Sequence, residues 1–122
     1  MKIVLLIGLP GSGKTHLLDT FSDDQWAKID DPMGTIDLPE GKDLIIADVK
    51  LIFSDVLEKA EQKLKAKYGQ VEIERIYFEN APEKCLRNVA YRNDGRLVGG
   101  FIRDYAKYYN PPENALVIWQ PE

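Results

Sequence analysis

Eight residues near the start of the chain combine glycine, lysine and threonine in a spacing that suits phosphate binding. They read Gly8-Leu9-Pro10-Gly11-Ser12-Gly13-Lys14-Thr15. The glycines allow successive backbone N–H groups to turn toward phosphate oxygens, while the lysine reaches the β- and γ-phosphates and acts in catalysis. The threonine hydroxyl is a ligand for Mg²⁺. The predicted nucleotide-binding residues are Gly8, Pro10, Gly11, Ser12, Gly13, Lys14, Thr15 and His16, the last by its position alone.

The segments on both sides of this loop are those that the motif requires. Residues 2–7 are apolar enough for a buried parallel strand, and residues 13–21 have the pattern of a helix. The N-terminus of a helix behind the loop adds partial positive charge that favours an anion. A chance glycine-rich turn and a degenerate loop are the alternatives, and the complete motif in this context disfavours both.

Asp48 follows four apolar residues at the end of a predicted strand. In P-loop proteins an aspartate at that place orders the water shell of the metal, so Asp48 joins Thr15 as a predicted Mg²⁺ residue. Asp48 can also cap the helix that follows, and the two roles are compatible. Val49 stands where many motor and transporter ATPases have a glutamate, and no Asn-Lys-x-Asp sequence for reading guanine is present. Both observations count against those classes.

Asp30 and Asp31 precede Pro32 at the end of the second predicted strand. The carboxyl ends of parallel strands form the ligand-binding edge of an open α/β sheet. A carboxylate there can accept the proton of an attacking hydroxyl, as the general base does in phosphoryl transfer. An Asx turn and a solvated acidic loop remain the alternatives.

The region between residues 83 and 107 is locally basic in an otherwise acidic protein. Arginine binds phosphate through its planar fork, so arginines here can close over a transferred phosphoryl group. The turn at residues 93–95 favours Arg92 and Arg96 for this role, with Arg87 as a third choice. The alternative is a solvated helix face with ordinary surface ion pairs.

Strand and helix patterns alternate along the whole chain, which is typical of parallel α/β units. The expected architecture is a three-layer α/β/α sandwich with the P-loop NTPase fold and five parallel strands. Asn80 is expected to cap the helix that contains the single cysteine, Cys85, as a buried apolar residue. The strands are expected at residues 2–7, 26–29, 43–48, 71–78 and 115–119, and the helices at 13–21, 51–68, 80–93 and 97–110.

The length of 122 residues favours a single domain, residues 1–122. The net charge of −4 argues against coating of nucleic acid by the whole surface. No apolar run approaches the roughly 20 residues of a membrane span, and one cysteine allows no internal disulfide. We therefore expect a cytoplasmic protein without a membrane partner, as a monomer or small homo-oligomer.

These features together resemble the small P-loop kinases of the polynucleotide kinase and zeta-toxin-like group. The likeness is carried by the loop at residues 8–15, by Asp30-Asp31, by residues 44–48, and by residues 77–92. It implies the strand order 2-3-1-4-5, ATP with Mg²⁺ as phosphate donor, Asp30 or Asp31 as base, and Arg92 or Arg96 as lid arginine. The chain departs from such kinases in the short segment between its second and third strands.

Two functions are expected from this pattern. The first is transfer of the ATP γ-phosphate to a hydroxyl of a nucleoside, nucleotide, nucleic-acid 5′ end or sugar. The second is a nucleotide-dependent binding module, in which ATP orders the region from Arg92 to Lys107 so that it engages a partner without phosphotransfer.

Overall fold

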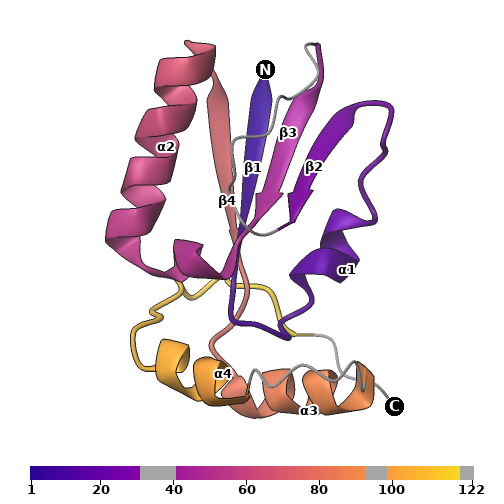
Figure 1. The fold of residues 1–122 in the computed structure, drawn as a ribbon, viewed down its shortest axis with the longest axis vertical. Coiled ribbons are helices and arrows are strands. Elements are labelled where there is room, and N and C mark those ends of the chain that lie inside the picture. Colours follow the sequence, from indigo (N-terminus) through magenta and orange to yellow (C-terminus); the bar gives the residue numbers. More distant parts are fainter. Residues whose placement is uncertain (31–40, 93–98, 119–122) are drawn as a thin grey trace.

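The computed structural model describes residues 1–30, 41–92 and 99–118, excluding the side chains of Asp30 and Arg92. Strands and helices alternate only in part along these residues, since the second strand is followed directly by the third and the last two helices follow one another, and Figure 1 shows their arrangement. The elements are β1 (Lys2–Ile7), α1 (Lys14–Leu18), β2 (Trp26–Asp30), β3 (Asp43–Ala47), the 3₁₀ helix η1 (Val49–Ile52), α2 (Ser54–Tyr68), β4 (Glu72–Tyr77), α3 (Pro82–Arg92) and α4 (Gly99–Ala106).

The four strands form one parallel sheet in the order β2-β3-β1-β4. Leu6 of β1 pairs with Ala47 of β3, and Ala47 pairs in turn with Asp30 of β2. The residues that follow these strands therefore leave the sheet at one edge. This register brings the start of the glycine-rich loop, Asp48 and Asp30 to the same end of the molecule.

Helices cover both faces of the sheet, because successive side chains of a strand point to opposite faces. Ile3, Leu5 and Ile7 of β1 belong to the larger core cluster, in which the buried residues of α2 pack. Val4 and Leu6 belong to a second cluster with Leu18 of α1. Figure 1 shows α1 and α2 on opposite sides of the strands, so the predicted α/β/α layering is present.

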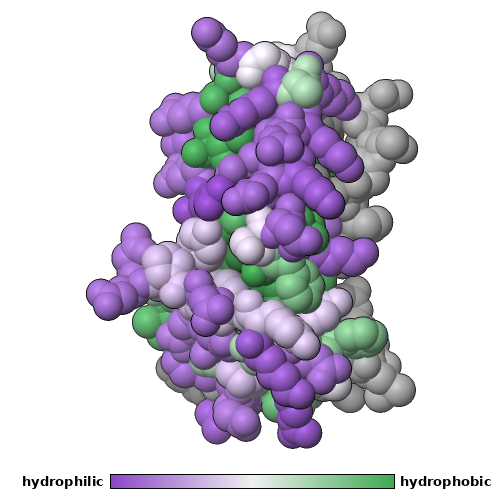
Figure 2. Space-filling model, turned by 90° about the vertical axis from the view of Figure 1, so that its left-hand side faces the viewer, coloured by the Kyte–Doolittle hydropathy of each residue, from purple (hydrophilic) through white to green (hydrophobic). Residues whose placement is uncertain are grey.

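Helices α3 and α4 lie beyond the carboxyl ends of the strands and not along a face of the sheet (Figure 1). We call α3, α4 and the described chain after them, up to residue 118, the lower block. Figure 2 shows weakly polar and apolar residues at the narrow part of the surface between the lower block and the part of the molecule that contains α2. The Phe53 ring, directly before α2, meets the Tyr105 ring of α4 edge-on, with 5.2 Å between centroids. The last part of the described chain thus closes the end of the sheet where the loop lies.

The expected fifth strand, residues 115–119, is not a strand of this sheet in the described part of the chain. A single parallel bridge joins Leu116 to Phe78, and the Leu116 N–H donates to the Tyr77 carbonyl at 2.8 Å. Val117 is 74% exposed. Ile118 is buried in the core, but the backbone pairing of this segment with the end of β4 is limited to the two bonds made by Leu116. The described sheet therefore has four strands and not five.

All four predicted helices are shorter in the described residues, and the first two differ for identifiable reasons. The first ends at Leu18 and continues as a turn, in which the Thr20 N–H and side-chain hydroxyl both donate to the Leu17 carbonyl. The expected helix at 51–68 is interrupted at Phe53, whose backbone is extended (φ −84°, ψ 121°) between η1 and α2. Gly69, with φ 77°, ends α2 at Tyr68.

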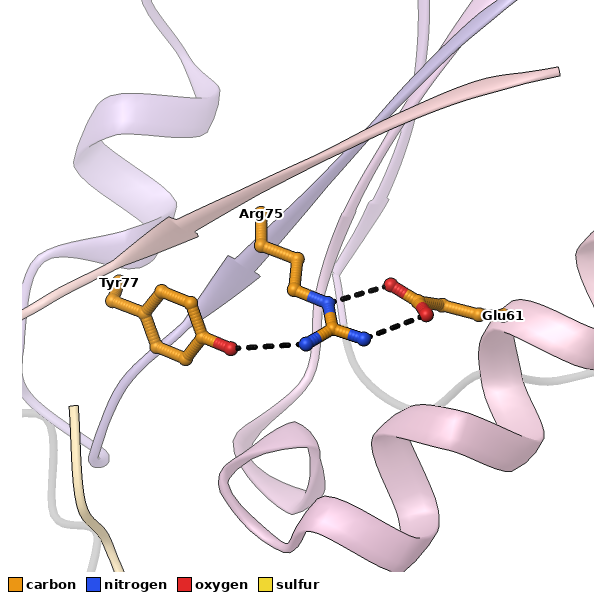
Figure 3. A network of polar contacts seen from close by, with 3 residues as sticks. All are labelled: Glu61, Arg75 and Tyr77. Atoms are coloured by element: carbon orange, nitrogen blue, oxygen red, sulfur yellow. Dashed lines mark hydrogen bonds and ion pairs between the residues drawn. The ribbon is translucent and has the colours of Figure 1, made fainter. Parts of the chain in front are cut away.

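A charged network fixes α2 over β4 (Figure 3). The Arg75 guanidinium of β4 donates from Nε and from its second terminal nitrogen to the two carboxylate oxygens of Glu61 in α2, both at 2.7 Å. It also donates to the Tyr77 hydroxyl at 3.4 Å. Hydrogen bonding to Arg75 lowers the pKa of Glu61. This bidentate geometry is more specific than a single ion pair and sets the position of the helix along the strand.

The chain after α4 is attached to the ends of two strands. The buried Tyr109 hydroxyl donates to the Ile7 carbonyl at 3.0 Å and to the Phe78 carbonyl. The Asn80 side-chain amide donates to the carbonyls of Ala106 and Tyr109, each at 2.9 Å. Asn80 therefore joins α4 to β4 and does not cap α3 through these bonds as expected. These contacts hold the lower block against the residue that precedes the glycine-rich loop.

None of the helices in the described ranges is both long enough and apolar enough to cross a lipid bilayer.

We expect Tyr109→Phe to lower the free energy of unfolding by about 1–3 kcal/mol, because two buried carbonyls lose a hydroxyl donor. Chemical denaturation of both proteins measures the change. Tyr108→Phe is the matched control, since Tyr108 is 64% exposed, and it should change the free energy of unfolding by less than about 0.5 kcal/mol. Equal effects of the two substitutions would contradict the attachment through Tyr109.

Candidate phosphate-binding site

The glycine-rich loop between β1 and α1 has backbone angles that favour glycine at two positions. Gly11 has φ 82° and Gly13 has φ 97°, both in the left-handed region. The Ser12 N–H donates to the Leu9 carbonyl at 3.1 Å, which closes a tight turn within the loop. Gly8 is in close contact as well, since a Cβ there would lie 2.6 Å from the Ser12 hydroxyl oxygen. The conformation of the loop therefore favours glycine at positions 11 and 13 and leaves little room for a side chain at position 8.

Lys14 begins α1 and is only 7% exposed. Its ammonium donates to the carbonyls of Gly8 (2.9 Å) and Leu9 (2.8 Å), and lies 3.4 Å from the Ser12 hydroxyl oxygen. Burying an ammonium is costly unless it is hydrogen-bonded, and the loop supplies oxygens for this purpose. The loop is thus folded around the amine of Lys14.

The two residues after Lys14 stand at the start of α1 with exposed side chains. These are Thr15, the predicted metal ligand, and His16. Pro10 and Gly11, earlier in the loop, are partly exposed. The predicted nucleotide-binding residues therefore form one continuous turn that is in part open to solvent.

Asp48 follows β3 and is 4% exposed. One carboxylate oxygen accepts the Lys50 N–H at 2.9 Å, so Asp48 caps η1. This is the capping role that the sequence left open beside metal binding. Because Ala47 pairs with Leu6 and Gly8 follows β1 by one residue, Asp48 stands next to the loop in the sheet.

The candidate base is described in part. Asp30 is the last residue of β2, in register with Ala47, so it belongs to the same edge as the loop and Asp48. Asp31 lies outside the described residues. The structure therefore places one of the two predicted carboxylate positions beside the strand that carries Asp48.

The candidate arginines are distributed over the lower block. Arg92 is the last residue of α3, and Arg96 lies outside the described residues. Arg87, the third choice, is exposed on α3. Lys107, from the same basic region, lies 3.8 Å from the Asp104 carboxylate, with both side chains about 70% exposed. An ion pair of this kind contributes little to stability and fits a solvated helix face.

Helix α3 contributes residues to the loop that the sequence analysis did not assign. The Asn88 side-chain amide donates to the Gly11 carbonyl at 3.0 Å. A Cβ on Gly11 would lie 2.6 Å from the Cys85 carbonyl oxygen and 2.9 Å from a Val89 methyl carbon. The available signal was Asn88 itself, a polar residue on the same helix face as Cys85 and Val89.

Cys85 is fully buried, as expected. Burial raises the pKa of the Cys85 thiol to about 11, and the positive charge of Lys14 opposes this increase in part. At neutral pH the side chain is therefore a thiol and not a nucleophilic thiolate. It acts as a packing residue beside the loop.

No model of a protein family matches the chain. A gluconokinase from Sinorhizobium meliloti 1021 has a similar structure, with a TM-score of 0.61 over 98% of this chain and 84% of that chain, at 10% sequence identity. The chain therefore has a P-loop kinase-like fold. This likeness supports the kinase-like fold and does not extend to the polynucleotide kinase group in particular.

An uncharacterized protein of Acanthamoeba polyphaga mimivirus is 38% identical over 119 residues, which cover 89% of this chain and 86% of that protein. The chain belongs to the same protein family as this mimivirus protein.

We expect Gly11→Ala to destabilise the protein more than Gly13→Ala. Both substitutions place a side chain at positive φ, but only the methyl group at Gly11 meets α3, since nothing lies within 4 Å of a Cβ at Gly13. The clash adds about 1–3 kcal/mol to the loss in free energy of unfolding, measured by denaturant titration. Equal losses would show that α3 does not pack on the loop in solution.

The thiol of Cys85 should react slowly with iodoacetamide in the native protein. Its pKa of about 11, against an ordinary value of 9.0, leaves about 100-fold less thiolate at pH 8. As the pH rises past 9, the Cys85 thiol ionises in the unfolded protein before it ionises in the folded protein. The free energy of unfolding should therefore fall between pH 9 and 11. Alkylation rates with and without urea measure the difference, and equal rates would contradict it.

Proposed function

We propose that the protein is a Mg²⁺-dependent phosphotransferase that moves the γ-phosphate of ATP to a hydroxyl group. The acceptor class is a nucleoside, a nucleotide, a nucleic-acid 5′ end or a sugar. The observation that carries the proposal is the buried Lys14 inside a complete glycine-rich loop, at the sheet edge that also holds Asp48 and Asp30.

The loop supplies the binding site for the phosphates of ATP. Its backbone N–H groups and the first turn of α1 favour the negative charge of the β- and γ-phosphates. The Lys14 ammonium exchanges the Gly8 and Leu9 carbonyls, its partners in the present structure, for phosphate oxygens. Since Lys14 is already at the start of α1, this requires a change of side-chain rotamer and not of fold.

Thr15 and Asp48 are the residues that would hold Mg²⁺. The Thr15 side chain is exposed at the start of α1, and Asp48 is a buried carboxylate at the end of the strand beside β1. Both offer oxygen, the element that Mg²⁺ prefers, and the phosphates and water complete its shell. When bound, the ion neutralises charge that develops on the phosphate oxygens.

Transfer requires a base for the acceptor and positive charge around the moving phosphoryl group. The acceptor oxygen attacks the γ-phosphorus of ATP. The bond between the γ-phosphorus and the bridging oxygen breaks, so that ADP leaves with that oxygen. The proton of the acceptor hydroxyl passes to Asp30 or Asp31. Arg92 or Arg96 donates hydrogen bonds to the phosphoryl oxygens. The position of Asp30 at the end of β2 supports this assignment for the base.

The structural comparison supports the kinase-like fold on which the proposal builds, and it leaves the acceptor open. The solved neighbour is a gluconokinase, and its fold covers nearly the whole of this chain. At 10% identity the likeness carries the fold alone. The acceptor must therefore be found by experiment.

A second function, nucleotide-dependent binding of a partner, is favoured by one contact. Asn88 of α3 donates to the loop at Gly11, so a change in the loop on ATP binding is transmitted to α3. In this case ATP orders the Arg92 to Lys107 region for a partner, and no phosphate moves.

The test is transfer of γ-phosphate from ATP with Mg²⁺ to nucleosides, nucleotides, oligonucleotide 5′-hydroxyl ends and sugars, followed by mass spectrometry. Lys14→Ala should reduce transfer at least about 100-fold, since it removes a charged donor at the phosphates. Asp30→Asn or Asp31→Asn should reduce it about 10²–10⁴-fold, whichever carboxylate is the base. Asp24→Asn is the matched control, because Asp24 is exposed before β2.

Transfer to one acceptor class that depends on Lys14 establishes the kinase and its substrate. ATP binding without transfer to any acceptor contradicts the kinase and favours the binding module. If neither Asp30→Asn nor Asp31→Asn changes the transfer rate, the assignment of the base is wrong.

A further inference from the structure

One peptide unit at the turn of the glycine-rich loop is held at both of its ends. The Gly11 carbonyl accepts the Asn88 side-chain amide at 3.0 Å, and the N–H of Ser12, on the same peptide plane, donates to the Leu9 carbonyl at 3.1 Å. A peptide plane that is bonded at both ends cannot turn over without losing both bonds. The second bond lies within the loop, but the first comes from α3, which is 77 residues away in the sequence.

The helix face that carries Asn88 is shaped to fit the loop. Cys85, Asn88 and Val89 have the spacing i, i+3, i+4, which places them on one side of α3. Gly11 approaches this side so closely that a Cβ would lie within 3 Å of Cys85 and Val89. Asn88 is 8% exposed, beside the fully buried Cys85. A buried amide is costly unless it is hydrogen-bonded, and the bond to Gly11 meets part of this need.

The chemical groups of Asn88 and Gly11 determine which of the two donates the hydrogen bond. A backbone carbonyl accepts hydrogen bonds only, so Asn88 must present its NH₂ group to Gly11. A carboxylate at this position has no hydrogen to donate, and an apolar side chain has none either. The contact therefore selects a side-chain amide or another donor of similar reach.

We infer that Asn88 is a positioning residue for the nucleotide phosphates and acts through the Gly11–Ser12 peptide. By engaging the Gly11 carbonyl, it keeps that oxygen from turning toward the phosphates, which it would repel, and holds the loop in one conformation before ATP arrives. Ordering a loop in advance reduces the entropy that binding must overcome. The inference rests on the nucleotide site of the proposed function, and it holds whether or not phosphate is transferred.

The same contact sets the place of the candidate arginine. Position 92 is one helical turn beyond position 88, so α3 carries it on the same side of the helix. The backbone of Arg92 is therefore at a fixed distance from the loop for as long as α3 is held at Gly11. In this arrangement α3 forms one wall of the candidate phosphate site.

The experiment compares Asn88→Leu and Asn88→Asp, which keep the size of the side chain and remove the donor. Asn88→Gln, which keeps an amide, should restore part of the effect. Glu83→Gln is the control, since Glu83 is exposed in the first turn of α3. For each protein, calorimetry measures the affinity for Mg²⁺-ATP, hydrogen exchange measures protection of the amides in residues 8–15 without nucleotide, and denaturation measures stability.

We expect Asn88→Leu and Asn88→Asp to bind Mg²⁺-ATP about 3- to 10-fold more weakly, as the loss of one hydrogen bond predicts, with faster exchange in the loop. Asn88→Gln should lie between these variants and the parent, and Glu83→Gln should equal the parent. Parent-like or tighter ATP binding by folded Asn88→Leu and Asn88→Asp, or unchanged exchange of the loop amides, would overturn the inference. If the parent binds no ATP, the proposed function fails, but the exchange measurement still tests the role of Asn88.

Discussion

The position of β1 between two parallel partners is the constraint on which the site depends. β1 pairs with β3 on one side and with β4 on the other, and its residues from Ile3 to Ile7 are buried. A strand in this position must deliver its following residues at the carboxyl edge of the sheet. Gly8 is the first of these residues, and its neighbours across the sheet are the segments that carry Asp48 and Phe78. The pairing register thus decides which side chains can meet a ligand held by the loop.

The loop in turn is held from two directions. From within the loop, the buried ammonium of Lys14 donates hydrogen bonds to the carbonyls of Gly8 and Leu9. From outside, α3 contacts Gly11 through Asn88. The acceptors in these contacts are backbone carbonyls of the loop, so the contacts depend on the backbone conformation that the glycines allow. The lower block of the molecule is for this reason a structural part of the candidate phosphate site.

The local features of the fold could be predicted from the sequence because they rest on short-range patterns. The apolar run before Gly8 predicted β1, and the glycine spacing after it predicted the loop and the start of α1, all of which the structure contains. The parallel sheet and the β2-β3-β1-β4 part of its order are confirmed, whereas the prediction of the fifth strand was wrong, because among the described residues of that segment Leu116 alone makes a bridge. The base, metal and lid roles of Asp30, Asp48 and Arg92 stay predictions.

Other features could not be predicted because they arise from contacts between distant residues. Asn88 donates to Gly11, which is 77 residues away in the sequence, and the residue pattern of α3 does not indicate which residue Asn88 contacts. Asn80 was predicted to be a helix cap because a glutamate, Glu83, stands three residues after it, but its side-chain amide donates to the carbonyls of Ala106 and Tyr109. The break at Phe53 follows from Asp48, whose carboxylate starts a 3₁₀ turn before α2 can begin.

The bond between the Tyr109 hydroxyl and the Ile7 carbonyl has a consequence for the order of events during synthesis. The two residues are 102 positions apart, so the end of β1 acquires this donor only after nearly the whole described chain has left the ribosome. At about 5–20 residues per second, several seconds separate the two. During that interval the glycine-rich loop exists without its final support. Newly made chains therefore complete the support of the glycine-rich loop late, after most of the described chain has been synthesised.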